Sequence, residues 1–268
     1  MDSQQASWIE TVSRLGIAVK GIVYGLIGIL AAQAAFGAGG KTSDTKGVLT
    51  TILNQPFGQL MLVLITIGLF GYAIYRFTEA FLDIENKGTD GEGLVHRLGY
   101  FCSGVVYAGL GVSAVRLIMG SGGGSSGDSS TQDWTAKLMS QPFGQWLVAA
   151  AGVITLGIAF YHFYEAFSAK FRRQLNWAEM SDTERTWAIR LGRIGHTARG
   201  VTFVIIGGFL IRAAITADPS EARGLSGALQ TLQQQAYGPW LLGLVAIGLV
   251  AYGVYLEAKA RYRRIAVN

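Results

Sequence analysis

Two glutamates and three arginines recur at matching positions in the chain, and they are the ionisable groups with the clearest chemical potential. Glu79 and Glu165 each lie at the end of an apolar segment, while Arg14, Arg97 and Arg193 each lie at the start of one. Ionisable groups beside apolar segments normally pair with each other, so the favoured interpretation is a ring of Arg–Glu pairs between neighbouring repeats. The alternative is a proton or ion site, in which Glu79→Gln would abolish flux and leave the fold intact.

A second group of basic residues could bind an anion. Lys20 and Arg199 occupy equivalent positions, with Ser103 at the third, one to two helical turns further into their segments. Arg116 and Arg212 are also equivalent and lie near the opposite ends. Long basic side chains commonly extend to the nearest membrane interface. The alternative is a basic pocket for a lipid headgroup or another anion, which makes all four residues candidate ligands.

Motifs of catalysis and cofactor binding are absent from the sequence. There is no P-loop, no nucleophile elbow and no zinc-protease motif. The histidines, His96, His162 and His196, follow no motif spacing and are interpreted as interfacial residues, the alternative being a haem, pigment or metal site. Cys102 is a single cysteine, which excludes an internal disulfide and a cysteine-rich metal site. We predict no enzyme activity and no metal site, and the sequence identifies no cofactor.

The segments that position these groups belong to a threefold repeat. Each copy opens with a basic residue, followed at fixed intervals by a glycine, a second glycine, an aromatic residue and a third glycine. The copies are Arg14–Gly28, Arg97–Gly111 and Arg193–Gly207, and their internal spacing is identical. We therefore expect three structurally equivalent helices.

A second recurring segment follows in each copy. Gln55–Gln59 and Gln141–Gln145 are both Gln-Pro-Phe-Gly-Gln, and the third counterpart, Ala236–Trp240, has its proline after the glycine. Proline suits the first turn of a helix, so the second helix of each copy is expected to start here. The ends of these helices match too, except that Lys259 stands in the third copy where the others have glutamate.

Composition and hydropathy indicate a membrane protein. Half of the 268 residues are hydrophobic, 15% are charged and the mean hydropathy is +0.35, whereas soluble domains are about a quarter charged. Six apolar runs have the length of about 20 residues that crosses a bilayer as a helix. They cover approximately residues 15–36, 57–75, 98–119, 143–164, 198–215 and 237–256. The first run resembles a signal peptide, but its two internal counterparts indicate that it is retained as a span.

We therefore predict an all-α polytopic membrane protein with one membrane domain, residues 1–268. Its six transmembrane helices form three two-helix repeats, and a flexible Gly/Ser-rich loop is expected at residues 120–132. The predicted repeats are residues 7–83, 90–170 and 181–264.

The basic residues predict the topology. Most of the 22 lysines and arginines fall at the ends of the spans where the termini lie, so the positive-inside rule places both termini in the cytoplasm. Each repeat then starts and ends on one side. Three such parallel repeats imply a pseudo-threefold axis along the membrane normal.

Glycines of the first helices are spaced for helix packing. Within each copy two glycines lie seven residues apart, nearly two turns, and so share one helix face. Small residues on one face allow close approach of helices. We expect the three first helices to pack tightly, with the pseudo-threefold axis as the suggested centre. These glycines are Gly21, Gly28, Gly104, Gly111, Gly200 and Gly207.

The recurring Arg-Leu-Gly openings, Pro-Phe-Gly segments and Tyr…Glu-Ala closings resemble the bacterial membrane family called domain of unknown function 1206. The resemblance covers residues 8–265 and implies six transmembrane helices as three pairs. It implies no established activity or ligand. Lys259 departs from the pattern, which argues against a mechanism that needs three equivalent carboxylates.

The favoured function is a non-enzymatic accessory protein of a bacterial inner membrane or a thylakoid. It would bind anionic lipid, a lipophilic ligand or a membrane-protein partner, including a second copy of itself, and no nucleic acid. The runner-up is a small channel or transporter along the pseudo-threefold axis. The centres of the predicted spans carry no charge, whereas transporters commonly place polar groups there, and this favours the first function.

Overall fold

The computed structural model describes residues 3–38, 40, 42–82, 88, 90–121 and 127–263, with side chains from Thr11 onward in the first helix. The regular elements of this described part are all helices, apart from one isolated bridge between Leu175 and Arg263. Six helices are long and apolar enough to cross a membrane, which confirms the predicted all-α fold. They are α1 (Ser3–Ala35), α3 (Gly58–Leu82), α4 (Gly91–Ile118), α6 (Gly144–Ser168), α7 (Asp182–Thr216) and α9 (Gly238–Tyr262).

A short helix precedes the second long helix of each repeat. These helices are α2 (Thr45–Leu53), α5 (Gly127–Met139) and α8 (Leu225–Gln233). The connections also contain the 3₁₀ turns η1 (Lys170–Gln174), η2 (Trp177–Glu179) and η3 (Pro219–Glu221). The expectation of a flexible loop at 120–132 is wrong for 127–132, which form the first part of α5, and residues 122–126 lie outside the described part.

The tight turns before the second long helices explain the repeated Pro-Phe-Gly sequence. Helices α3, α6 and α9 all begin at a glycine, Gly58, Gly144 or Gly238. A Cβ on any of these glycines would overlap a carbonyl oxygen of the preceding short helix, so only glycine fits. The predicted helix starts are confirmed. Only in α9 does the proline itself stand in the first turn.

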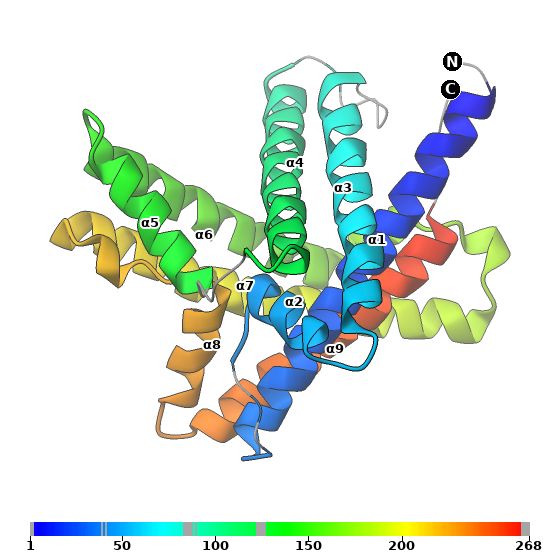
Figure 1. The fold of residues 1–268 in the computed structure, drawn as a ribbon. Helices are drawn as coiled ribbons and strands as arrows, with labels where there is room; N and C mark the ends of the chain where they lie inside the picture. The colour runs from blue at the N-terminus through cyan, green and yellow to red at the C-terminus, as the bar shows by residue number, and fades with distance from the viewer. Residues whose placement is uncertain are drawn as a thin grey trace.

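The long helices pair chiefly between neighbouring repeats. α3 packs along α4, α6 along α7, and α9 along α1, and these three antiparallel pairs make the most extensive contacts (Figure 1). The second helix of each repeat therefore packs on the first helix of the next, and α9 returns to α1 to complete the series. A threefold relation between repeats requires this cyclic order.

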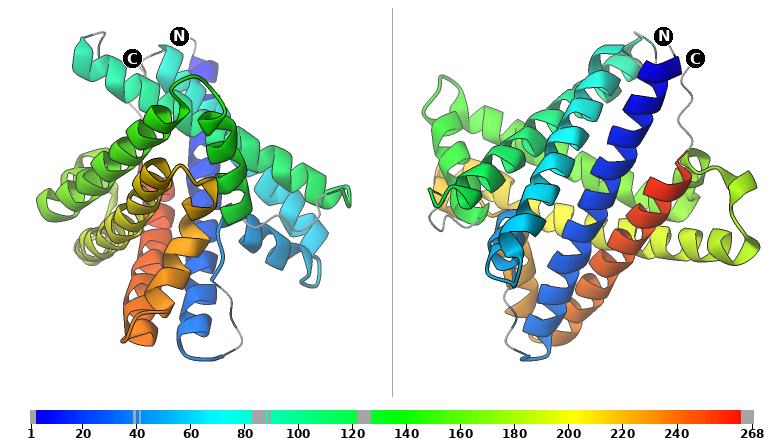
Figure 2. Two further views of the ribbon diagram at one scale, coloured as in Figure 1. Left: turned by 90° about the vertical axis from the view of Figure 1, so that its left-hand side faces the viewer. Right: turned by 45° about the vertical axis from the view of Figure 1, so that its right-hand side comes forward.

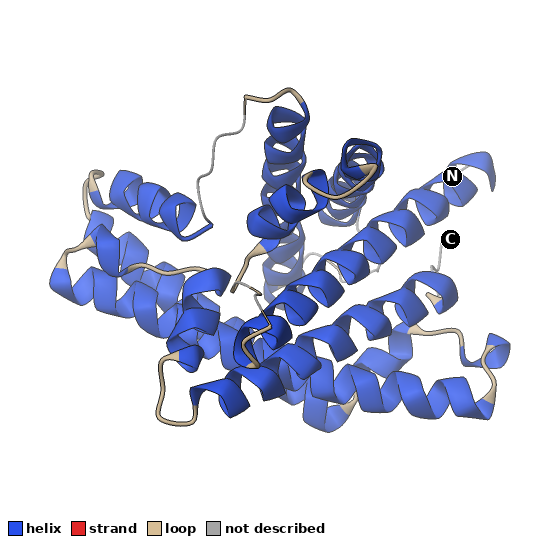
Figure 3. Cartoon of the chain, turned by 60° about the horizontal axis from the view of Figure 1, so that its bottom comes forward, coloured by secondary structure: helices blue, strands red, loops and turns tan. Residues whose placement is uncertain are grey.

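The three pairs are strongly inclined to one another. In Figure 1, α3 and α4 stand upright, α1 and α9 run diagonally, and α6 and α7 run across the view. The start of α1 and the end of α9 lie at the same end of the molecule in both views of Figure 2. Figure 3 shows the helices in blue and the loops in tan; each short helix lies in the connection between the first and second long helices of its repeat.

The repeated glycines line the seams within these pairs. A Cβ on any of the six would stand 2.5 to 2.9 Å from an atom of the partner helix. The partners are themselves equivalent by sequence: Gly21 faces Glu257, Gly104 faces Phe77 and Gly200 faces Phe163. The second set follows the same rule: Gly28 faces Val250, Gly111 faces Phe70 and Gly207 faces Leu156. The expectation that these glycines surround a central axis is therefore corrected, because each stripe faces the second helix of the preceding repeat.

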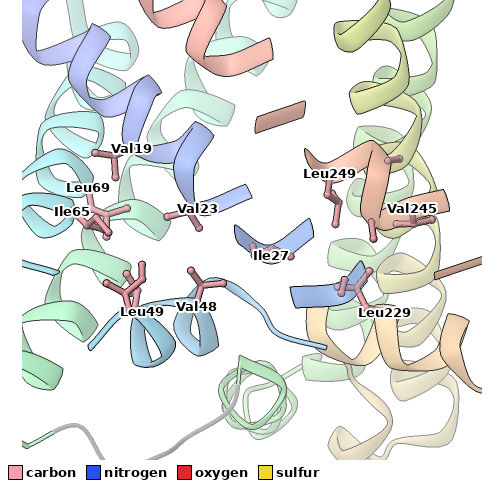
Figure 4. Packing of buried hydrophobic residues seen from close by; sticks show 14 of the residues in the cluster. Val19, Val23, Ile27, Val48, Leu49, Ile65, Leu69, Leu229, Val245 and Leu249 are labelled. Carbon is pink, nitrogen blue, oxygen red and sulfur yellow. The ribbon is translucent and has the colours of Figure 1, made fainter. Parts of the chain in front are cut away.

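The main apolar core lies where repeats 1 and 3 meet. It combines Val23 and Ile27 of α1 with Leu49 of α2, Leu229 of α8 and Leu249 of α9, all of them buried (Figure 4). Close van der Waals packing of these side chains favours contact between the two repeats. The core therefore joins the first and last parts of the sequence.

Contacts within a repeat are unequal. In repeats 1 and 3 the two long helices touch: Gly16 packs on Tyr72 and Gly195 on Tyr252, where an added Cβ would meet an atom at 2.6 Å. At the equivalent Gly99, no atom of the described residues lies within 4 Å of an added Cβ. Contacts between α4 and α6 are correspondingly few among the described residues. Repeat 2 is therefore open where its counterparts are closed.

Candidate anion-binding site

Lys20 projects from α1 between two tyrosine rings of other helices. Its ammonium lies 5.1 Å from the ring centroid of Tyr72 on α3 and 5.3 Å from that of Tyr107 on α4. The Tyr72 hydroxyl lies 3.4 Å from Lys20 Nζ and also accepts from Arg76. The faces of aromatic rings attract cations, so both tyrosine rings stabilise the Lys20 ammonium in this position.

Arg199 occupies the equivalent place in repeat 3. Its guanidinium lies over Tyr24, Phe203 and Tyr252, at 4.8 to 5.1 Å from their ring centroids. Arg199 Nη1 donates to the Tyr252 hydroxyl at 2.7 Å. The Nε atom of Arg199 is buried and has no hydrogen-bond partner among the described residues. One of its donors therefore remains for a ligand.

Together these side chains form one group, which we call the central basic cluster. Tyr24 and Tyr252 are in edge-to-face contact at 5.2 Å, as are Tyr72 and Tyr107 at 4.5 Å. The cluster consists of Lys20, Tyr24, Tyr72, Tyr107, Arg199, Phe203 and Tyr252. Its members come from all three repeats.

The cluster carries positive charge without a bound carboxylate. Among the described residues, no aspartate or glutamate oxygen lies within 4.0 Å of Lys20 or Arg199. The two cations also repel each other. Ionisable groups inside a membrane normally have partners. The arrangement is therefore suited to an anionic ligand.

The side chain of Lys20 points into the fold. Its ammonium lies between Tyr72 of α3 and Tyr107 of α4 and not along the outer surface of α1. These contacts do not support the interpretation of Lys20 as a side chain that extends to the nearest interface. The expectation that the centres of the spans carry no charge stays a prediction.

His162 and His196 form a buried pair beside the cluster. Their Nδ1 atoms are 3.0 Å apart, so one ring donates and the other accepts. His196 also stacks on Phe171, and His162 lies 5.6 Å from Phe203. The described residues contain no group of three metal-ligating side chains. The spacing of these histidines in the sequence carried no sign of the pair.

The ion pairs at Glu79 differ from the predicted ones. Glu79 is buried and pairs with Arg76 at 2.5 Å and with Arg263 at 2.9 Å, and the Tyr75 hydroxyl also donates to it. The repeat pattern did not predict either arginine as a partner of Glu79, because neither stands at the repeated arginine position that opens each copy. Glu165 is also buried and accepts from the Tyr161 hydroxyl at 3.1 Å.

Two of the three repeated arginines bind backbone carbonyls. Arg14 donates to the carbonyl of Arg261 at 2.5 Å, and Arg97 donates to the carbonyl of Ala80 at 2.8 Å. Arg193 is exposed. Within the described residues no ion pair joins these three arginines to either glutamate, so the predicted pairs are corrected. Arg14 and Arg97 lie beside the C-terminal ends of α9 and α3, where carbonyl groups without helical partners attract positive charge.

The other candidate ligands lie apart from the cluster. Arg116 and Arg212 are exposed near the ends of α4 and α7, and Arg212 pairs with Glu221 at 2.9 Å. A surface pocket of about 430 Å³, lined in part by Trp177 and Arg185, is also separate. Arg185 already binds the Trp177 carbonyl. Of the four candidate ligands, the structure brings only Lys20 and Arg199 together.

The tyrosines of the cluster were missed as site residues although their pattern was visible. Tyr72 and Tyr252 are equivalent in the second helices, and Tyr24 and Tyr107 are equivalent in the first helices. From the sequence these tyrosines were interpreted as packing or interfacial residues, and nothing in their spacing indicated that they meet at one site. Their sharing of one site depends on the contact of helices from different repeats.

Comparison with known proteins agrees with the repeat architecture. The family model described as Domain of Unknown Function (DUF1206) matches residues 15–83, 98–169 and 194–263. An "Uncharacterized protein YxxB" of Bacillus subtilis (strain 168) is 38% identical over 258 residues, covering 96% of this chain and 92% of the relative. No solved structure matches. The chain is an integral membrane protein that belongs to the DUF1206 family.

Proposed function

We propose that this protein is a non-enzymatic membrane protein that binds the phosphate headgroup of an anionic phospholipid in the central basic cluster. The observation that carries the proposal is the placement of Lys20 and Arg199 in one aromatic site, with no carboxylate within ion-pair distance among the described residues. Anionic lipids are a ready source of negative charge beside a membrane protein, and basic sites between transmembrane helices bind their headgroups.

The donors of the cluster suit a phosphate group. Arg199 presents an unused Nε–H beside its bonded Nη1, and guanidinium groups bind phosphate through such neighbouring donors. Lys20 adds a second charge. The hydroxyls of Tyr72 and Tyr252 each accept from an arginine, which leaves their own protons to donate. A phosphate has enough oxygens to use these donors together.

Native mass spectrometry would test this binding. The protein would be purified in mild detergent and titrated with phosphatidylglycerol and, separately, with phosphatidylcholine. We expect retained phosphatidylglycerol in the native protein and at least about tenfold weaker retention in the Lys20→Gln/Arg199→Gln double variant, because charged hydrogen bonds contribute roughly 1.5–3 kcal/mol each.

The matched control is the Arg116→Gln/Arg212→Gln double variant, which removes the same charge from exposed sites. It should retain phosphatidylglycerol as the native protein does. A fatty acid titration separates a phosphate from a carboxylate as the preferred group. Equal retention of phosphatidylglycerol by the native protein and the Lys20→Gln/Arg199→Gln variant would contradict the proposal.

A second candidate function is the passage of a small anion through the same site. The specific support is the placement of Lys20 and Arg199 among rings from all three repeats, where their charge could lower the barrier for an anion. Chloride efflux from liposomes containing the protein would test it. Efflux that disappears in the Lys20→Gln/Arg199→Gln variant would favour this function over lipid binding alone.

A further inference from the structure

One helix face is buried in repeats 1 and 3 and exposed in repeat 2. On the first helices, Val23 and Thr202 are 3% and 1% exposed, whereas the equivalent Val106 of α4 is 59% exposed. On the second helices, Tyr72 and Tyr252 are almost fully buried, whereas the equivalent Ile158 of α6 is 41% exposed. The faces through which α4 and α6 would contact each other therefore have no protein partner among the described residues.

The sequence contains a steric reason for this difference. Gly68 in α3 faces Val19, and Gly248 in α9 faces Ala198, so closely that a Cβ on either glycine would overlap the facing side chain. The equivalent position in α6 is Ile154. Its branched side chain fills the space that the glycines leave free, which opposes the same approach of α6 to α4.

Residues of α4 and α6 that lie close to the open face contact members of the central basic cluster. Tyr107 of α4 belongs to the cluster and lies under Lys20. On the other side, His162 of α6 packs on Phe203, which lies under Arg199. Lys20 thus contacts a ring of α4 directly, and Arg199 contacts a ring of α7 that packs on α6. An anion bound there would have apolar surface of α4 and α6 beside it.

From this arrangement we infer that an acyl chain of the bound anionic phospholipid lies along the open face, against Val106 of α4 and Ile154 and Ile158 of α6. The inference rests on the proposed headgroup site and identifies the path by which the lipid reaches it, laterally from the bilayer between α4 and α6. Charge selects the headgroup, and the exposed aliphatic side chains pack against the acyl chain.

Photo-crosslinking would locate the chain. Phosphatidylglycerol with a diazirine near the end of one acyl chain would be irradiated with the full-length protein in nanodiscs, and the modified peptides identified by mass spectrometry. We expect crosslinks concentrated on the peptides that contain Val106, Ile154 and Ile158. Phosphatidylcholine with the same diazirine should label all lipid-facing helices, including the exposed Leu60 and Leu64 of α3.

The same substitution at two neighbouring residues gives a matched comparison, because any general effect on folding should be similar at both. Ile154 and Val153 are similarly exposed, at 63% and 61%. The residues equivalent to Val153 in the other repeats, Ile67 and Ile247, are exposed as well, so this position lies on the outer surface in all three repeats. Ile154→Trp should lower phosphatidylglycerol retention relative to the native protein, because the indole would occupy space that the acyl chain needs. Val153→Trp should leave it unchanged.

The outcomes separate the two proposals. Retention that depends on Lys20 and Arg199, together with crosslinks spread evenly over all helices, would overturn the path along α4 and α6 and leave the headgroup site standing. Retention that is independent of both cations would overturn the headgroup site itself. A native dimer mass that Ile154→Trp abolishes, while Val153→Trp leaves it unchanged, would show that a second copy covers the face and would also overturn the inference.

Discussion

Arg263 and Glu79 form a buried ion pair between the last turn of the fold and its second long helix, with Nη2 2.9 Å from Oε1. The pair joins residues that are 184 positions apart in the sequence. Next to it, the backbone of Asn176 donates to the Tyr262 carbonyl at 2.7 Å. The end of α9 is therefore attached both to repeat 1 and to the connection between repeats 2 and 3.

Breaking this pair should destabilise the protein. Glu79→Gln removes the negative charge that Arg76 and Arg263 share in a buried site, and breaking a buried ion pair at one partner typically costs about 3–5 kcal/mol. We expect a clear fall in the apparent melting temperature in detergent. Arg261→Ala, two residues from Arg263 and exposed, is the control and should change little. If Glu79→Gln unfolds at the native temperature, the pair is not a structural link, and a proton or ion role for Glu79 becomes the better interpretation.

The seam between α1 and α9 predicts opposite effects for two glycines of one helix. A Cβ on Gly28 would lie 2.7 Å from the Ala246 carbonyl, whereas a Cβ on Gly25 would meet nothing within 4 Å. Gly28→Ala should therefore destabilise the protein by roughly 1–3 kcal/mol through overpacking. Gly25→Ala should be neutral or stabilising by up to about 1 kcal/mol through helix propensity. Thermal unfolding of both variants in one detergent checks this contrast.

The open second repeat can be tested with one substitution at three equivalent positions. Gly16→Ala and Gly195→Ala introduce a Cβ 2.6 Å from the facing tyrosine and should destabilise the fold, while Gly99→Ala enters open space and should be tolerated. The comparison uses the same chemical change in each repeat. Similar destabilisation by all three would mean that α4 and α6 are in contact.

Cys102 provides an independent chemical probe of the same face. It is exposed on α4, whereas the equivalent Val19 of α1 is 5% exposed. We expect a small maleimide to modify Cys102 in the folded protein, and to modify the Val19→Cys/Cys102→Ser variant only after denaturation. The measurement is the added mass per chain with time. Equal rates for the two cysteines in the native state would argue against an open face.

The sequence by itself determined the helices and their repetition. Apolar runs of membrane-spanning length specify six long helices without reference to any other part of the chain, since each helix satisfies its own backbone hydrogen bonds. The spacing of Gly21 and Gly28 likewise predicted a packing stripe, because residues two turns apart share a face. Lys20 and Arg199 could be chosen as candidate ligands because the repeat alignment makes them equivalent.

Only the tertiary structure decided which helices those features face. The glycine stripes pack on the preceding repeat, Glu79 pairs with Arg263, and Tyr72 and Tyr252 join the two cations from separate helices. Helical periodicity specifies which side of a helix a residue occupies but not which helix packs against it. That choice depends on the fit of side chains brought together from distant segments, as at Ile154, where one branched side chain stands in place of glycine and α4 and α6 remain apart.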